Sequence, residues 1–169
     1  MKQIIYLVGQ ISTSAPETYN WRERFIQFWR NKFEDYNEFS SRLEIINPCF
    51  TEWNSDILEK NYRTEPTEPF KQYLMKETDV LPPKDRAFVQ RSTIGIVNVN
   101  QYDPNKPLIG SYFELAWYYD SPDKTVIGIC EGPRTHNINA NHPFVRQTVN
   151  TWVENEIKAC RLLERFFIG

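Results

Sequence analysis

The stretch "GSYFELAWYYDSPDKTVIGI", residues 110–129, decides the fold class, because it places a helical pattern directly before a buried strand. Its last five residues are β-branched or glycine and carry no charge, which favours a strand that is covered on both faces. The first ten residues, "GSYFELAWYY", are small, apolar or aromatic apart from one carboxylate, Glu114. A helix that leads into a near-continuous apolar strand is the unit from which parallel α/β sheets are built.

The same pattern extends outward over the rest of the chain. Three further apolar runs predict strands: "QIIYLVG" (3–9), "RLEIINP" (42–48) and "STIGIVNVN" (92–100). Helical patterns separate these strands, as residues 21–33 illustrate with large rings at helical spacing. The sequence therefore predicts one α/β domain, flavodoxin-like or Rossmann-like, with a parallel sheet of about five strands and helices on both faces.

Two other segments complete the predicted organisation. The tail from Pro143 to Phe167 repeats apolar residues at helical spacing and predicts one long amphipathic helix, with the proline suited to its first turn. Residues 54–84 are punctuated by prolines and predict an irregular insertion with a short helical piece at 70–77. A chain of 169 residues has the length of one domain.

Composition excludes several classes of function. The net charge is −2 with acids and bases interspersed, so we expect neither a nucleic-acid polymer nor a membrane surface as the partner. The cysteines Cys49, Cys130 and Cys160 share no metal-type or redox spacing and are interpreted as core residues or bystanders. No signal peptide and no membrane-spanning apolar run is visible, which favours a cytoplasmic protein.

Three loops are expected to meet at one edge of the predicted sheet. Residues 9–16, 100–114 and 131–143 follow predicted strands and are rich in Gly, Pro, Asn and Ser. In open parallel sheets, ligands bind outside the carboxyl ends of the strands. The second of these loops contains Glu114, so this glutamate is expected to lie near a bound ligand.

Glu114 admits two interpretations. It can be an ordinary first-turn helix acid, favoured there by the helix dipole. Alternatively, a carboxylate held among rings and helix-start N–H groups can attack the anomeric carbon of a sugar, through an oxocarbenium-like transition state and a covalent glycosyl-enzyme. Gly110, four residues earlier, lets the backbone turn tightly and gives a ligand close access. Such chemistry needs no metal and no organic cofactor, and we expect none.

Several segments together resemble the nucleoside 2-deoxyribosyltransferase family, within a superfamily that also contains deoxynucleotide N-hydrolases. The resemblance lies in "IIYLVG" at the N-terminus, "DRAFVQRSTIGIVNVN" in the middle, and "GSYFELAWYY" before "KTVIGI". The segment "NWRER" and the "NP" after the second predicted strand are similar to a divergent branch of it. The segments follow the family order over most of the chain, apart from the insertion.

The resemblance implies roles for five matching positions. Glu114 matches the nucleophile, Asp85 the acid that helps the base depart, and Tyr6 the tyrosine that positions the nucleophile. Gly9 matches the glycine of the first loop, and Gly110 opens the catalytic turn. From the residues alone, Tyr6 can equally be a core aromatic and Asp85 the N-cap of the helix that follows it.

Four further residues are assigned to substrate binding by the same resemblance. Ser111 takes the second position of the catalytic turn. In the family, an Asn near the start of the last helix completes the active site of a neighbouring subunit. Here Asn139, Asn141 and His142 are all candidates, and the sequence does not choose among them; Asn141 can instead cap the last helix, and His142 can be a surface residue.

Two departures from the family pattern bear on the substrate. The residues before Gly110 are "NKPLI", which offer no polar or acidic group at the place where many relatives hold the 5′ end of the sugar. After the nucleophile, "AWYY" stands where the family often has small residues, so Trp117 and Tyr118 can narrow the pocket or face a partner subunit. Together with Tyr112 and Phe113 they are near enough in sequence to supply aromatic walls.

The resemblance implies an enzyme that breaks the N-glycosidic bond of a nucleoside or nucleotide, with transfer of deoxyribose to another base expected first. Hydrolysis of a nucleotide is the alternative, because it uses the same glycosyl-enzyme. A module that binds a nucleotide with little catalysis is a further alternative, motivated by the missing 5′ contact. We also expect a homo-oligomer, because rings beyond what one core covers favour a subunit interface.

Overall fold

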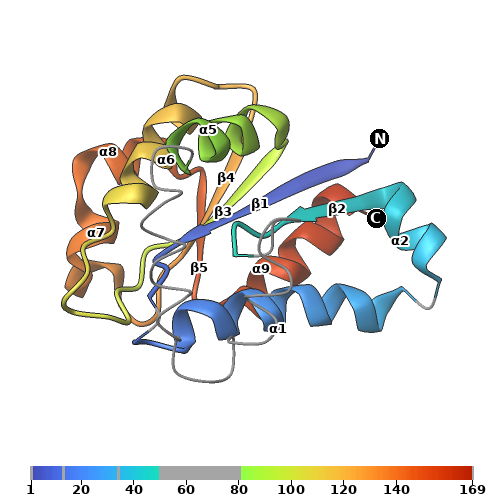
Figure 1. Cartoon of the computed structure of the whole chain (residues 1–169), viewed down its shortest axis with the longest axis horizontal. Helices are drawn as coiled ribbons and strands as arrows, with labels where there is room; N and C mark the ends of the chain where they lie inside the picture. The colour runs from blue at the N-terminus through green and yellow to red at the C-terminus, as the bar shows by residue number, and fades with distance from the viewer. Residues whose placement is uncertain (1, 13, 34, 50–80, 169) are drawn as a thin grey trace.

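The computed structural model describes residues 2–12, 14–33, 35–49 and 81–168. Within this part of the chain, five parallel strands form one sheet in the order β2-β1-β3-β4-β5 (Figure 1). The strands are β1 (Gln3–Gly9), β2 (Leu43–Ile46), β3 (Ile94–Asn98), β4 (Thr125–Ile129) and β5 (Thr151–Val153). The predicted α/β sheet is therefore confirmed, and its strand order is that of a flavodoxin-like fold.

Helices cover both faces of the sheet (Figure 1). One face carries α1 (Glu17–Lys32) and α9 (Glu156–Leu163), which pack against each other. The other face carries α5 (Leu81–Arg91), α6 (Ile109–Tyr119), α7 (Ile138–Asn141) and α8 (Pro143–Thr148). The other elements of the described residues are α2 (Tyr36–Arg42), the short helix η2 (Arg134–His136) and the final turn η3 (Glu164–Ile168).

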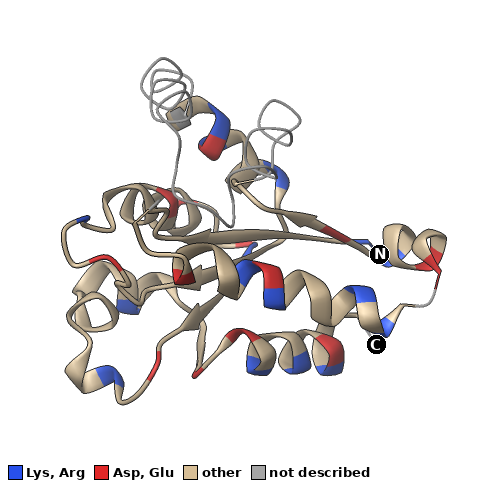
Figure 2. Ribbon diagram, turned by 60° about the horizontal axis from the view of Figure 1, so that its bottom comes forward, with Lys and Arg blue, Asp and Glu red and all other residues tan. Residues whose placement is uncertain are grey.

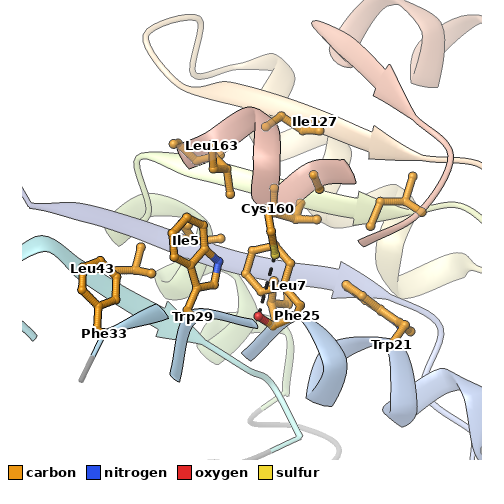
Figure 3. Close-up of a cluster of buried hydrophobic side chains, with 14 residues drawn as sticks. Ile5, Leu7, Trp21, Phe25, Trp29, Phe33, Leu43, Ile127, Cys160 and Leu163 are labelled. Carbon is orange, nitrogen blue, oxygen red and sulfur yellow. Dashed lines mark hydrogen bonds between the residues drawn. The ribbon is translucent and has the colours of Figure 1, made fainter. Parts of the chain in front are cut away.

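Alternation along β1 divides the core into two layers. Ile5 and Leu7 point to the face under α1 and α9, where they join a cluster that includes Trp29 and Cys160 (Figure 3). Tyr6, between them, points to the opposite face under α5 and α6. Because side chains alternate along a strand, the sheet itself assigns Tyr6 to the layer that also contains α6.

The predicted long C-terminal helix is wrong. The segment forms α8, then the edge strand β5, and then α9. Asn150 starts this change, because its side-chain oxygen accepts a hydrogen bond from the Val126 amide at 2.7 Å and its own amide donates to the Val126 carbonyl. The Asn155 side chain then caps α9 by accepting from the Lys158 amide. The apolar residues that repeat at helical spacing in this segment therefore belong to two helices and the strand between them.

The predicted insertion at 54–84 lies mainly outside the described residues, as does its helical piece at 70–77. Its last four residues, 81–84, form the first turn of α5. Pro82 and Pro83 fit there because the first turn of a helix has no partners for its N–H groups.

The carboxyl ends of the strands lie in one register. Gly9 pairs with Asn98, Asn98 with Ile129, and Ile129 with Val153. After β1 the chain passes to α1 on one face, whereas after β3 it passes to α6 on the other (Figure 1). The crevice between β1 and β3 is thus the point at which open α/β sheets bind ligands.

Positive and negative side chains are intermixed over the described part of the protein. Lys and Arg alternate with Asp and Glu along α1 and α9 (Figure 2). Among the residues that the structure describes, none of the helices has the length and apolar character needed to cross a membrane.

Candidate active site

A cavity of about 340 Å³ lies at the carboxyl edge of the sheet, where the loops after β1 and β3 meet. It joins residues that are far apart in the sequence. The lining residues are Gly9, Gln10, Ile11, Pro48, Asp85, Lys106, Pro107, Leu108, Ile109, Gly110, Ser111 and Glu114. The cavity therefore brings together five of the predicted site residues: Gly9, Asp85, Gly110, Ser111 and Glu114.

Glu114 lies in the second turn of α6, because the helix begins at Ile109. This position excludes the interpretation of Glu114 as a first-turn acid. Its carboxylate is 7% exposed and accepts a hydrogen bond from the Tyr6 hydroxyl. The two residues are 108 positions apart, so the bond joins the sheet to the helix.

Close packing of α6 on β3 aims Glu114 at Tyr6. One turn further along α6, the ring of Tyr118 lies over Gly95, where an added Cβ would stand only 2.6 Å from the ring carbon Cζ. The Tyr118 hydroxyl forms a 2.7 Å hydrogen bond with the Ser92 hydroxyl. Glycine in β3 thus lets the helix approach the sheet closely.

Asp85 lies in the second turn of α5 and does not cap it. Its Oδ1 atom is 3.7 Å from the ammonium of Lys84 and is a buried atom without a hydrogen-bond partner. Burial is the main cause that raises the pKa of Asp85. A half-buried carboxyl with one buried, unused oxygen beside a cavity is a suitable proton donor to a ligand.

Both carboxyls of the site, Glu114 and Asp85, have pKa values above those of ordinary surface acids. Burial, followed by the charge of Asp85, raises the pKa of Glu114 to about 8, while the hydrogen bond from Tyr6 lowers it. Burial and the neighbouring carboxyls raise the pKa of Tyr6 well above its ordinary value, so Tyr6 remains a hydrogen-bond donor. Two carboxyls with raised pKa values in one cavity favour sharing a single proton near neutral pH.

Side chains tie together the two loops that form the cavity. The Gln10 amide accepts from the Asp103 N–H at 2.8 Å and donates to the Asp103 and Lys106 carbonyls at 2.9 and 2.5 Å. The Ser12 hydroxyl donates to the Asp103 carboxylate, which lowers the pKa of Asp103. This network holds together the loop after β1 and the loop after β3, which form the rim of the cavity.

The two predicted site glycines have different physical roles. An added Cβ at Gly9 would lie 3.2 Å from both the Asn98 carbonyl oxygen and the Trp21 ring, so Gly9 serves close packing. At Gly110, an added Cβ would meet nothing within 4 Å, so this position faces open space beside the cavity. Gly110 matches the expected access for a ligand, whereas Gly9 is constrained by the core.

Three predicted binding residues do not line the cavity. Asn139 uses its side chain within the fold, because it accepts from the Tyr112 hydroxyl at 2.5 Å and donates to the Val99 carbonyl at 3.0 Å. Asn141 donates to the Arg134 carbonyl rather than capping α8. His142 is exposed, with its ring beside those of Tyr112 and Phe144.

The expected aromatic wall is also absent from the described lining of the cavity. The Tyr112 hydroxyl is bonded to Asn139, and Tyr118 is buried over Gly95. Phe113 is 60% exposed on the outer side of α6, with its ring near that of Trp117.

Sequence reasoning missed several cavity residues, among them Gln10, Pro48 and Lys106. It also missed Arg22, which is fully buried behind Gly9 and Gln10. One signal was visible: Arg22 is a charge beside the apolar stripe of α1 that contains Trp21, Phe25 and Trp29. The described residues contain no cluster of three or more His, Cys, Asp or Glu side chains that could hold a metal ion.

Neither the protein-family models nor the curated proteins give a match to this chain.

Proposed function

We propose that this protein is an N-glycosidic bond enzyme that acts on a nucleoside or nucleotide, with deoxyribosyl transfer between bases as its reaction. The observation that carries the proposal is the buried Glu114 carboxylate, which lies at the switch-point cavity, is held by Tyr6 and is electrostatically coupled to Asp85. Pairs of carboxyls in different environments are the usual machinery of glycosidic bond cleavage.

The productive state places the shared proton on Asp85 and leaves Glu114 anionic. The Glu114 oxygen attacks the anomeric carbon, the bond from that carbon to the base nitrogen breaks, and its electron pair leaves with the base. Asp85 delivers its proton to the departing base. The Tyr6 hydrogen bond supports this state, because it stabilises the anionic carboxylate.

The second half of the reaction releases the sugar from Glu114. The nitrogen of a second base attacks the anomeric carbon, the ester bond to Glu114 breaks, and Asp85 takes up the proton of the incoming base. Hydrolysis differs only in that water is the nucleophile. One observation favours hydrolysis as the second candidate: no aromatic side chain among the described residues lines the cavity to stack an acceptor base.

An incubation of donor nucleosides and nucleotides with and without a free acceptor base tests the proposed function. We expect the acceptor to yield a new nucleoside or nucleotide and to lower the yield of free sugar, because both nucleophiles compete for one glycosyl-enzyme. Chromatography of bases, nucleosides and sugar provides the readout. Free sugar unaffected by the acceptor identifies a hydrolase, and no reaction of any donor favours a binding module.

The role of Asp85 predicts a dependence on the leaving base. Asp85→Asn is expected to reduce turnover of natural donors by about 10²- to 10⁴-fold, because the amide cannot protonate the base. A donor with an activated nitrophenyl-type leaving group needs little protonation and is expected to lose far less. Equal losses on both donors contradict the assignment of Asp85 as the acid. Arg86→Gln, on the exposed side of α5, is the control.

We also propose that the enzyme is a homo-oligomer. Exposed apolar side chains gather on the adjoining helices α6, α7 and α8: Ile109, Phe113, Ile138 and Phe144. Such a surface is typical of an interface between subunits. A second subunit here would stand beside the cavity, because Ile109 also lines it.

Phe113→Glu is expected to convert the oligomer to a monomer of 20.2 kDa, because a charge would be buried in the interface. Light scattering at micromolar concentration measures the mass. Tyr36→Glu replaces another exposed ring on α2 and is expected to leave the mass unchanged. A wild-type protein that is fully active as a monomer contradicts the proposal.

A further inference from the structure

Arg22 is a cation with no exposed surface, and it lies behind the wall of the cavity. Its Nη2 atom donates to the Gly9 carbonyl at 2.8 Å, and Nη1 donates to the Gln10 carbonyl at 3.2 Å. Nε is 3.4 Å from the Leu7 carbonyl, and Nη1 also donates to the Thr18 carbonyl. The guanidinium thus binds the main-chain carbonyls at the end of β1 and just after it.

Among the residues that the structure describes, no carboxylate contacts the Arg22 guanidinium directly. Every hydrogen bond that the described residues give its guanidinium ends on a main-chain carbonyl, and none ends on a carboxylate. The guanidinium carbon also stands 4.6 Å from the centroid of the Trp21 ring. A buried cation without a carboxylate partner is costly, and this cost points to a role beyond packing.

The main chain that Arg22 holds links its charge to the carboxylate of the site. The peptide units of Gly9 and Gln10, which Arg22 holds, line the same cavity as Glu114. The positive charge of Arg22 is among the causes that lower the pKa of Glu114, against the effect of burial. A buried cation near a carboxylate favours its charged form.

We propose that Arg22 is a positioning residue of this site, which fixes the cavity wall through the Gly9 and Gln10 carbonyls and places a buried positive charge behind the wall that Glu114 shares. The catalytic consequence rests on the proposed function, since an anionic Glu114 is the nucleophile there. Arg22 does not contact the reacting atoms and acts through the main chain and through its field.

Other charged and titratable groups also act on Glu114. Asp85 and Lys84 face it from α5, and Tyr6 faces it from β1. Tyr118, on α6 itself, and Cys49, after β2, are neutral neighbours whose own pKa values are raised mainly by burial. Among the described residues, the cations whose charge lowers the pKa of Glu114 are Arg22 on α1 and Lys84 on α5. Arg22 is the fully buried one of the two.

The test compares the wild type with Arg22→Met and Arg22→Lys. Carbon-13 NMR follows the pH midpoint at which the Glu114 carboxyl titrates, and the signal is assigned by its disappearance in Glu114→Gln. The pH profile of kcat/KM for base release is measured on the same proteins. Arg86→Met, which removes an exposed guanidinium from α5, is the matched control.

We expect Arg22→Met to raise the Glu114 midpoint by roughly one pH unit, and the acid limb of the pH profile to move with it. At neutral pH, kcat is expected to fall more than KM changes, because less enzyme carries the anionic nucleophile. Arg22→Lys keeps a charge but cannot span the four carbonyls, so a smaller change in the midpoint and a loss in kcat are expected. Arg86→Met is expected to match the wild type.

An unchanged Glu114 midpoint in Arg22→Met, or an equal change in Arg86→Met, overturns the proposal. If Arg22→Met fails to fold, Arg22→Lys decides, and an unchanged midpoint with an unchanged kcat overturns it. The midpoint is measured without substrate. A wild type that releases no base therefore contradicts the proposed function, whereas the titration still decides whether Arg22 acts on Glu114.

Discussion

Glu114→Gln is expected to reduce base release by several orders of magnitude, because an amide oxygen cannot form the covalent glycosyl-enzyme. Glutamine keeps the shape of the side chain and can still accept the Tyr6 hydrogen bond, so the fold is expected to persist. Chromatography of released base measures the effect, and a melting curve confirms folding. A 2′-fluoro-arabino nucleoside is expected to add its sugar mass to the wild type in intact mass spectrometry and not to the variant.

Glu156→Gln is the matched control for this experiment. Glu156 is a buried carboxylate on α9, paired with Arg24 at 2.5 Å, and it lies outside the lining of the candidate site. We expect its loss to leave base release within a few-fold of the wild type. Activity of Glu114→Gln within the same range, or a sugar adduct that persists in it, means that another residue is the nucleophile.

The second large effect is a dependence of stability on pH. The pKa of Glu114 rises from 4.5 to about 8 on folding, so the folded state binds the proton more tightly than the unfolded state. The contribution of Glu114 to stability is therefore complete below about pH 4.5 and is lost as pH rises toward 8. A tenfold difference in proton affinity between the two states is worth about 1.4 kcal/mol, so the total loss reaches several kcal/mol.

Glu114→Gln removes this titration and is expected to be more stable than the wild type at pH 8, by several kcal/mol, and comparable to it at pH 4.5. The difference between the two free energies of unfolding, measured by denaturant titration across this range, must increase with pH. Glu156→Gln, which breaks an ion pair instead, is expected to show no such gain. A difference that stays constant, or that decreases with pH, contradicts the buried-carboxyl account of the site.

Local pattern was sufficient to predict most of the fold. The runs around Ile5, Ile45, Ile96 and Ile127 are short and apolar, and each forms a parallel strand. The last strand was hidden, because Trp152 and Val153 continue a helical spacing and only their pairing to β4 reveals them. That pairing is long-range information, and periodicity within one segment does not contain it.

The candidate site was predictable where the chain carries an isolated polar group at a strand end or helix start. Glu114, alone in its apolar run, is of this kind, whereas Asp85 lies between Lys84 and Arg86 and was predicted from the family resemblance; both line the cavity. Asn139 shows why the sequence does not choose among the loop candidates, since an asparagine in a loop serves equally to bind a ligand and to satisfy main-chain groups, and here it contacts Val99 and Tyr112. Gln10 and Lys106 were missed because their proximity depends on two loops meeting across the sheet.

Two glycines of the central strands accommodate aromatic rings, and this links positions that are distant in the chain. At Gly128 an added Cβ would stand 2.5 Å from a Trp152 ring carbon, and Gly95 stands in the same relation to Tyr118. The glycine cannot gain a side chain while the ring stays in place. Over evolutionary time, a methyl group at position 128 becomes acceptable only after the indole has given way to a smaller side chain. The same holds for positions 95 and 118, where a smaller residue must replace Tyr118 before a side chain can be added at Gly95. The two residues of each pair are therefore expected to be substituted together among descendants of this chain.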